Sequence, residues 1–412
     1  MSSVLLPLLL YKTVTQAEVK ELPHFNLETE LRLARLEGFP IDFQDIRRRT
    51  SIVADEENAA IPLQKIKISR DILGEVDKIT FTSIKNHESR LFAQSVIDDN
   101  QDVLKSITES TSKPGYFVDR KWEDGIFVIF PDITNLMNIR KLLTKAIIVE
   151  SERGNHDQCL VYAESITQLS SYILGPNISN IIVHEGFYET YVRILIQLAS
   201  RFPNELRYTK YLRKSIENWP INLRLEGFKC GLPQWLKLYD DLKNRNSVKS
   251  NSILTEALEI DFNEVVEGGQ EPEFTLGKAA LVNAFRIAVH QAKKSDPGSR
   301  MPLAGAFANA FLLSSGNPNF ANNYFLLFTY FLPLNDFTSF VIPERKLALY
   351  KQAADVLSSM KYDAGEDEVL SDRGELLTII RSISDGSITL TLKGPTVSDD
   401  DELSITFPLP DK

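Results

Sequence analysis

The sequence predicts a mainly α-helical fold of antiparallel helical hairpins, in a bundle or a degenerate helical repeat, with a small C-terminal β-hairpin. Apolar residues recur at helical spacing from residue 132 to about residue 242, and the connections between these helices are short. Two runs of alternating apolar and polar residues close the chain. The 412 residues, 43% hydrophobic and 25% charged, are typical of a globular protein with two or three domains.

The first 25 residues are predicted to form an apolar tail. Residues 4–11, VLLPLLLY, are too few to cross a bilayer, which takes about 20 apolar residues. No basic residue precedes this run and Lys12 follows it directly, whereas a signal peptide carries its basic residues first. We interpret residues 1–25 as the remnant of an anchor or a signal.

The first elements after the tail are short. An amphipathic helix is expected over residues 26–38, and Asp42 begins a second element. Asp55 is a good N-cap for a third helix, and a fourth is expected over residues 98–108. Residues 115–131 are aromatic and β-branched, which indicates a short hairpin or an extended loop.

Five helices are predicted between residues 132 and 242. Asn204 caps the fourth of them, and the fifth starts at Ile221, although Gly231 and Pro233 could break it. The residues of the first three helices expected to face the core are Leu136, Ile139, Leu143 and Ala146, then Cys159, Ala163, Ile166, Leu169 and Ile173, then Tyr188, Tyr191, Leu195 and Leu198.

The helical domain is expected to extend over residues 26–360 and could divide near residues 243–275, where the chain is polar. Residues 325–334, FLLFTYFLPL, are apolar on all sides, so a helix here must be buried in the core. Further helices are expected over residues 276–293, 304–313 and 343–360.

The last segment, residues 361–412, is acidic and is predicted to contain the β-hairpin. Eleven acidic and three basic residues lie between residues 362 and 402, so this stretch carries −8 of the net charge of −10. Residues 387–392 and 403–409 supply the two alternating strands. The acidic loop between them, residues 399–402, is interpreted as a solvated turn, with a calcium site as the alternative because Ca²⁺ takes oxygen ligands.

Common catalytic and cofactor motifs are missing from the sequence. It contains no HExxH, CxxC, GxGxxG, GxxxxGK[ST] or GxSxG, and its two cysteines cannot form a disulfide framework or a cysteine-only zinc site. We therefore assign no catalytic, cofactor-binding or metal-binding residue from the sequence and expect no cofactor. Whether the protein is an enzyme is left open, with a non-enzymatic role favoured.

Three residues are the candidates for chemistry. His156 precedes Cys159 by three residues, so both face the same side of a helix, as a Cys–His nucleophile would need. His184 lies at helical spacing with Ile181 and Tyr188, so it is expected to point inward. A core or interface histidine is the favoured interpretation and a general base the alternative.

Nucleic acid is not an expected partner, because the chain is acidic overall. One basic pattern could bind RNA: Arg207, Lys210 and Lys214 are interleaved with Tyr208 and Tyr211. Helical spacing separates the two sets onto different faces, so we interpret this segment as a solvated amphipathic helix.

Several stretches taken in order resemble a large family of bacterial helical proteins of unknown function, which usually carry one N-terminal membrane anchor. The C-terminal piece of that family is similar to the globular ends of type II secretion pseudopilins. The family has no known catalytic residues. The resembling stretches are EGFPIDFQDI at residues 37–46, DEENAA at 55–60, DDNQDVLKSI at 98–107, IRKLLTKAIIVESERGNHDQCLVYAESITQLSSYI at 139–173, NISNIIVHEGF at 177–187, PERKLALYKQAA at 343–354 and DDDELSITFPLP at 399–410.

These observations predict a non-enzymatic helical scaffold that binds another protein and is associated with the cell envelope through the family resemblance. The alternatives are an enzyme of unrecognised type, with a pocket near His156, Cys159 and His184, or a small-ligand module with a cavity lined by residues 325–334. The resemblance places the protein at the membrane or on the periplasmic side, whereas the N-terminus as written favours the cytoplasm. The sequence does not predict the oligomeric state.

Overall fold

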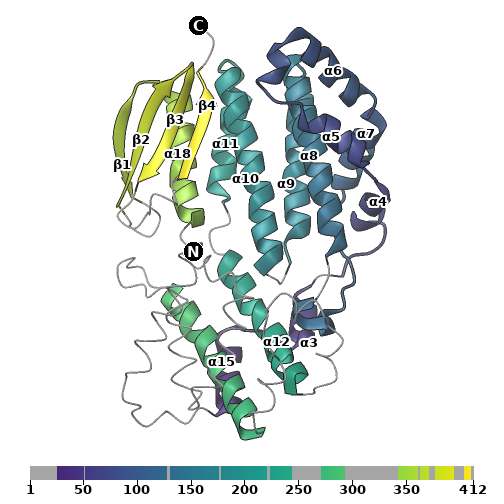
Figure 1. The fold of residues 1–412 in the computed structure, drawn as a ribbon, viewed down its shortest axis with the longest axis vertical. Coiled ribbons are helices and arrows are strands. Elements are labelled where there is room, and N and C mark those ends of the chain that lie inside the picture. The colour runs from purple at the N-terminus through teal and green to yellow at the C-terminus, as the bar shows by residue number, and fades with distance from the viewer. Residues whose placement is uncertain are drawn as a thin grey trace. The chain divides into compact units, whose positions relative to one another are not determined.

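The computed structural model describes residues 26–50, 52–127, 130–175, 178–219, 223–243, 271–292, 342–360, 362–370, 376–393 and 403–409. These residues form a mainly helical fold with a small C-terminal antiparallel sheet, which confirms the predicted fold class (Figure 1). The chain divides into two compact units. Of the described residues, the larger unit holds those within 39–238, residues 291–292 and those from 342 onward, and the smaller holds 26–38, 239–243 and 271–290.

The larger unit begins with five short helices. The first begins at Asp42, as predicted, and Asp42 caps it, because its Oδ1 accepts a hydrogen bond from the Asp45 amide at 2.8 Å. Asn86 accepts two amide hydrogen bonds at the start of the fourth, a helix that the sequence analysis did not predict. The helices are α3 (Phe43–Arg49), α4 (Ala60–Lys65), α5 (Arg70–Asp77), α6 (His87–Asp98) and α7 (Gln101–Thr111).

Two boundaries predicted for this region are wrong. Asp55 lies in a turn and α4 starts only at Ala60, because Asn58 holds the chain to a distant segment. The side-chain nitrogen Nδ2 of Asn58 donates to the Phe117 carbonyl at 2.9 Å, and the side-chain oxygen Oδ1 of Asn58 accepts from the Phe117 backbone amide at 3.0 Å. The helix expected over residues 98–108 is instead α7, which starts after α6 ends and extends to Thr111.

The segment between α7 and α8 is an extended loop that ends in a 3-10 helix, Trp122–Phe127. The sequence left a hairpin or a loop open here, and no hairpin occurs among the described residues of this segment. The loop is held by its isolated pairing with residue 58 and by the ion pair of Arg120 with Asp132.

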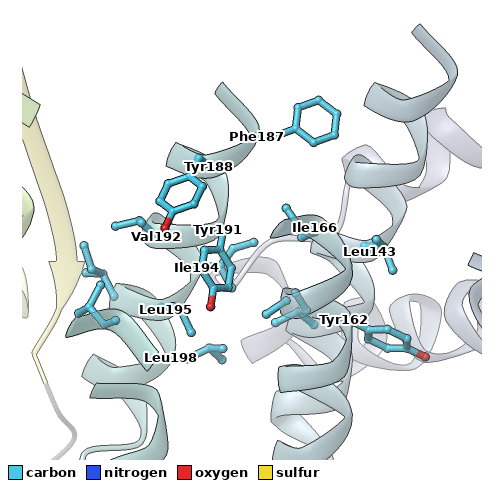
Figure 2. Packing of buried hydrophobic residues seen from close by; sticks show 14 of the residues in the cluster. Leu143, Tyr162, Ile166, Phe187, Tyr188, Tyr191, Val192, Ile194, Leu195 and Leu198 are labelled. Atoms are coloured by element: carbon cyan, nitrogen blue, oxygen red, sulfur yellow. The ribbon is translucent and has the colours of Figure 1, made fainter. Parts of the chain in front are cut away.

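Four consecutive helices form the centre of the larger unit, each contacting the next, as short connections imply. All thirteen residues predicted to face the core from the first three are buried. Leu143, Ile166 and Tyr191 belong to one cluster of buried side chains drawn from these helices (Figure 2). The helices are α8 (Pro131–Glu152), α9 (His156–Ile173), α10 (Ile178–Arg201) and α11 (Leu206–Glu217).

Two longer helices follow. In α12 (Leu223–Lys243), Pro233 lies inside the helix, so neither this proline nor Gly231 ends it. In α18 (Ile342–Ser359), Pro343 occupies the first turn, where its missing amide hydrogen costs no hydrogen bond. This helix contacts α10, α11 and the sheet.

The C-terminal sheet has four strands in the order β1–β2–β3–β4, all antiparallel: β1 (Gly365–Leu370), β2 (Leu376–Ser384), β3 (Ser387–Lys393) and β4 (Leu403–Pro408). The predicted hairpin is the β3–β4 pair, in which Leu390 opposes Ile405. Strand β2 pairs with β3 and so extends the hairpin. Its buried residues Leu377 and Ile379 alternate with less buried ones, a pattern that is harder to recognise in the sequence because acidic residues surround it. Gln197 of α10 donates to the Thr406 carbonyl at 2.9 Å and joins the sheet to the helices.

The smaller unit brings two helices together, α2 (Leu27–Leu36) and the part of α15 (Glu271–Ala292) that belongs to it. The expected helix over residues 26–38 is confirmed: Asn26 caps α2 and Gly38 follows it at φ +80°. Arg286 of α15 pairs with Glu30 and Glu37, each at 2.6 Å.

Several predicted segments lie outside the described residues: the tail at 1–25, the helices at 304–313 and 325–334, the loop at 399–402, and most of 243–275. None of the helices in the described part of the chain combines the length and apolar character that crossing a membrane requires.

Candidate functional site

A pocket of about 820 Å³ lies in the larger unit and is lined by α7, the α8–α9 turn, the first turns of α9, and the start of α11. Its wall is mostly polar and open on one side. Gln101, Lys105 and Thr108 line it from α7. Their spacing of four and three residues places them on one face of that helix.

The α8–α9 turn depends on Gly154. This residue has φ +73°, a conformation that costs other residues roughly 1 kcal/mol or more. The Gly154 amide donates to the Ser151 carbonyl and the Asn155 amide to the Glu150 carbonyl, which closes the end of α8. Gly154 therefore shapes the turn by which α8 and α9 line the pocket.

Arg153 connects the turn to α6. Its Nη2 donates to both carboxylate oxygens of Asp98 at 2.9 Å, and its Nη1 donates to Glu150 at 2.8 Å. Glu150 also accepts a hydrogen bond from the Asn155 amide group at 2.5 Å and is almost completely buried. Both oxygens of Glu150 are therefore engaged, and these hydrogen bonds hold the carboxylate in place.

Two further cations line the pocket from its sides. Arg207 of α11 forms ion pairs with Asp157 of α9 and with Glu205, and its distance to Glu205 is 2.7 Å. The hydrogen bond from Arg207 to Glu205 lowers the pKa of the Glu205 carboxyl. Lys105 lies 3.9 Å from Glu109, and both side chains are well exposed. Of Lys105, Arg153 and Arg207, which line the pocket, Lys105 is therefore the least neutralised, since solvent weakens so long an ion pair.

His156 lines the pocket, and its Nδ1 lies 2.8 Å from the hydroxyl of Tyr208. Cys159 is behind the wall: it is 0% exposed, its thiol contacts the Ile147 carbonyl at 3.5 Å, and burial raises its pKa to about 12. A nucleophilic cysteine needs the opposite shift. The two residues share a helix face, but the environment of Cys159 does not suit a Cys–His nucleophile.

His184 belongs to a different place, the contact between α9 and α10. Its Nδ1–H donates to the Ser170 carbonyl at 2.7 Å, and the Ser170 hydroxyl donates to the His184 carbonyl at 2.9 Å. The side chain is buried and is not part of the pocket wall. His156, Cys159 and His184 therefore do not form one site.

Acid is expected to destabilise the larger unit through His184. Burial is the main cause that lowers its pKa from the ordinary value of 6.5, against an opposing hydrogen bond to Ser170. His184 then binds a proton more readily in the unfolded chain than in the folded protein, so its protonation favours unfolding. The stabilisation of the fold by the neutral imidazole is fully present above about pH 6.5 and is lost as pH falls toward the pKa of the folded state. Urea denaturation on both sides of that pH should show a smaller pH dependence for His184→Gln than for the wild type. Equal pH dependence would contradict this role.

Neither cysteine should react with thiol reagents in the native protein. Cys159 and Cys230 are both buried, and burial raises the pKa of each thiol, so little thiolate is exposed at neutral pH. Alkylation followed by peptide mass spectrometry should label both only after denaturation. Rapid native labelling of Cys159 would restore it as a candidate nucleophile.

The basic residues of α11 are separated from its tyrosines, as predicted. Lys210 and Lys214 are exposed, whereas Tyr208 and Leu212 are buried. Among the residues that the structure describes, no group of three or more His, Cys, Asp or Glu side chains is arranged to hold a metal ion.

Sequence reasoning did not single out Gln101, Lys105, Glu150 or Arg153. The features of the sequence that could have indicated the pocket were the polar face of α7 and the glycine between α8 and α9. Neither feature indicates that α7 and the α8–α9 turn lie close together. Comparison of the chain with models of known protein families gives no match, and comparisons with curated proteins and with solved structures find no significant similarity.

Proposed function

We propose that the protein is a non-enzymatic helical scaffold that binds another protein. The observation that carries the proposal is the open, mostly polar pocket at the α8–α9 turn. Its walls belong to helices whose inner faces are buried in the core, so the pocket is already formed before a partner binds. Little binding free energy is therefore lost in ordering these helices. The envelope setting that the family resemblance implies is part of this proposal.

The state of the charged groups also supports binding rather than catalysis. Glu150, Arg153, Asp157 and Arg207 line the pocket and are engaged in ion pairs. A general acid or base must exchange protons near neutral pH, and paired carboxylates and guanidinium groups are poorly suited to that role.

The proposal can be tested with the tagged full chain, crosslinked in its own host and recovered from envelope and soluble fractions separately. The partner found is then purified and recombined with the protein. A stoichiometric complex that reforms from the two purified components supports the scaffold. Recovery of partner-free, soluble protein contradicts it.

A catalytic pocket is the second candidate, favoured by one observation. His156 lines the pocket and is held by Tyr208 at 2.8 Å, as a positioned imidazole base would be. Turnover of a small substrate that is abolished by His156→Gln, with the fold intact, would favour this candidate over the scaffold.

A further inference from the structure

We propose that the pocket at the α8–α9 turn receives an extended, hydrophilic peptide segment of the partner protein, with an acidic side chain directed to Lys105. This inference rests on the proposed scaffold function and adds the binding site and the chemistry of the bound segment. A volume of about 820 Å³ lies within the range of sites that hold a ligand or a short segment.

Amide side chains line the pocket from two helices. Gln101 lines it from α7, and Gln158 lines it from the first turn of α9. Each amide offers both donors and an acceptor, which matches the alternating carbonyl and N–H groups of a peptide main chain. An extended segment leaves those groups unpaired and so is able to bond with these amides, whereas a helix already uses them internally.

The charges of the wall favour an acidic residue over a basic one. Both carboxylates that line the pocket are engaged, Glu150 with Arg153 and Asn155, and Asp157 with Arg207. Within the described part of the chain, the ion pair of Lys105 is the exposed contact with Glu109 at 3.9 Å. An incoming carboxylate can therefore bind Lys105 without breaking a close ion pair, whereas an incoming ammonium group would compete with the guanidinium already paired to each lining carboxylate.

Other ligand classes fit the wall less well. An apolar molecule would leave the polar groups of the lining without hydrogen bonds. It would also find few apolar contacts, since Val161 is the main apolar side chain of the lining. A divalent cation would need several oxygen ligands, and the two lining carboxylates are already engaged.

A random-peptide display library, screened on the immobilised full chain, tests the inference. Selected peptides are synthesised with a fluorescent label, and their dissociation constants are measured by anisotropy. We expect hydrophilic sequences with a shared acidic residue. Their binding should weaken about tenfold or more in Lys105→Glu, since hydrogen bonds to charged groups contribute this much, and measurably in Gln158→Ala.

The matched control is Lys65→Glu, which reverses the same charge at an exposed position of α4 outside the pocket and should leave affinity unchanged. Lys105 is exposed, so its substitution should not impair folding, which a urea curve verifies. Failure to select any peptide, selection of basic peptides, or equal binding by Lys105→Glu would overturn the inference.

The partner complex separates this inference from the proposed function. If the complex reforms with the Lys105→Glu protein at wild-type affinity, the scaffold function stands and the pocket is not its binding site. If no partner is recovered with the wild type, the scaffold function itself fails.

Discussion

Asp132→Ala is expected to lower the free energy of unfolding of the larger unit by about 3–5 kcal/mol. Asp132 accepts two hydrogen bonds from Arg120, at 3.0 and 2.7 Å, and a third from the Tyr116 hydroxyl at 2.8 Å. The side chains of the ion pair are only 10% and 4% exposed. Removal of the carboxylate leaves a buried guanidinium without its counter-charge, and that desolvation cost accounts for the size of the effect.

Urea denaturation followed by tryptophan fluorescence measures this loss. All three tryptophans, Trp122, Trp219 and Trp235, are buried in the larger unit and report on its unfolding. Asp77→Ala is the control, because it breaks the exposed ion pair with Lys141 and should cost less than about 1 kcal/mol. Equal losses for the two variants would show that Asp132 is not a buried anchor of the loop before α8.

Phe187→Ala is expected to cost a similar amount, about 3–5 kcal/mol, for a different reason. The ring is 0% exposed in the central cluster (Figure 2), and the Arg140 guanidinium lies over it at 4.7 Å from the ring centre. Truncation leaves a cavity that rigid helices close only in part, and it removes the aromatic face from a half-buried cation.

Ile182→Ala on the same helix is the matched control. Its side chain is 36% exposed, so the change should cost much less, within about 1 kcal/mol, in the same urea experiment. Phe187→Leu should fall between the two, because it fills part of the cavity. If Phe187→Ala were no more destabilising than Ile182→Ala, the interior of the four central helices would not be closely packed at this position.

The interior of the central helices was predictable because it depends on local periodicity. Leu143, Ile166 and Tyr191 each belong to a series of buried residues spaced three or four positions apart on one helix. Residues at this spacing share a helix face whatever surrounds the helix. The start of α3 at Asp42 was predictable for the same reason, since the cap hydrogen bond joins Asp42 to its own first turn. The predicted cap Asn204 was wrong, because Glu205 occupies the N-cap position of α11.

Asp55 shows where local reasoning fails. Its sequence context suits an N-cap, but Asn58 bonds to Phe117 far along the chain and the helix starts later. The sheet is larger than the predicted hairpin because β2 pairs with both β1 and β3, and a pairing between strands is a tertiary property. Glu366 and Glu368 then lie exposed on β1, a strand that the sequence analysis did not predict.

The helical class, the buried stripes of the central helices and the alternation of the last two strands each depend on residues close together in the chain, so the sequence was enough to predict them. Which polar residues meet depends on the tertiary structure. It brought Lys105 of α7, His156 of α9 and Arg207 of α11 to the lining of one pocket, and it buried Cys159 away from that lining. Contacts between residues far apart in sequence leave no periodic signal, so the pocket could not be foreseen.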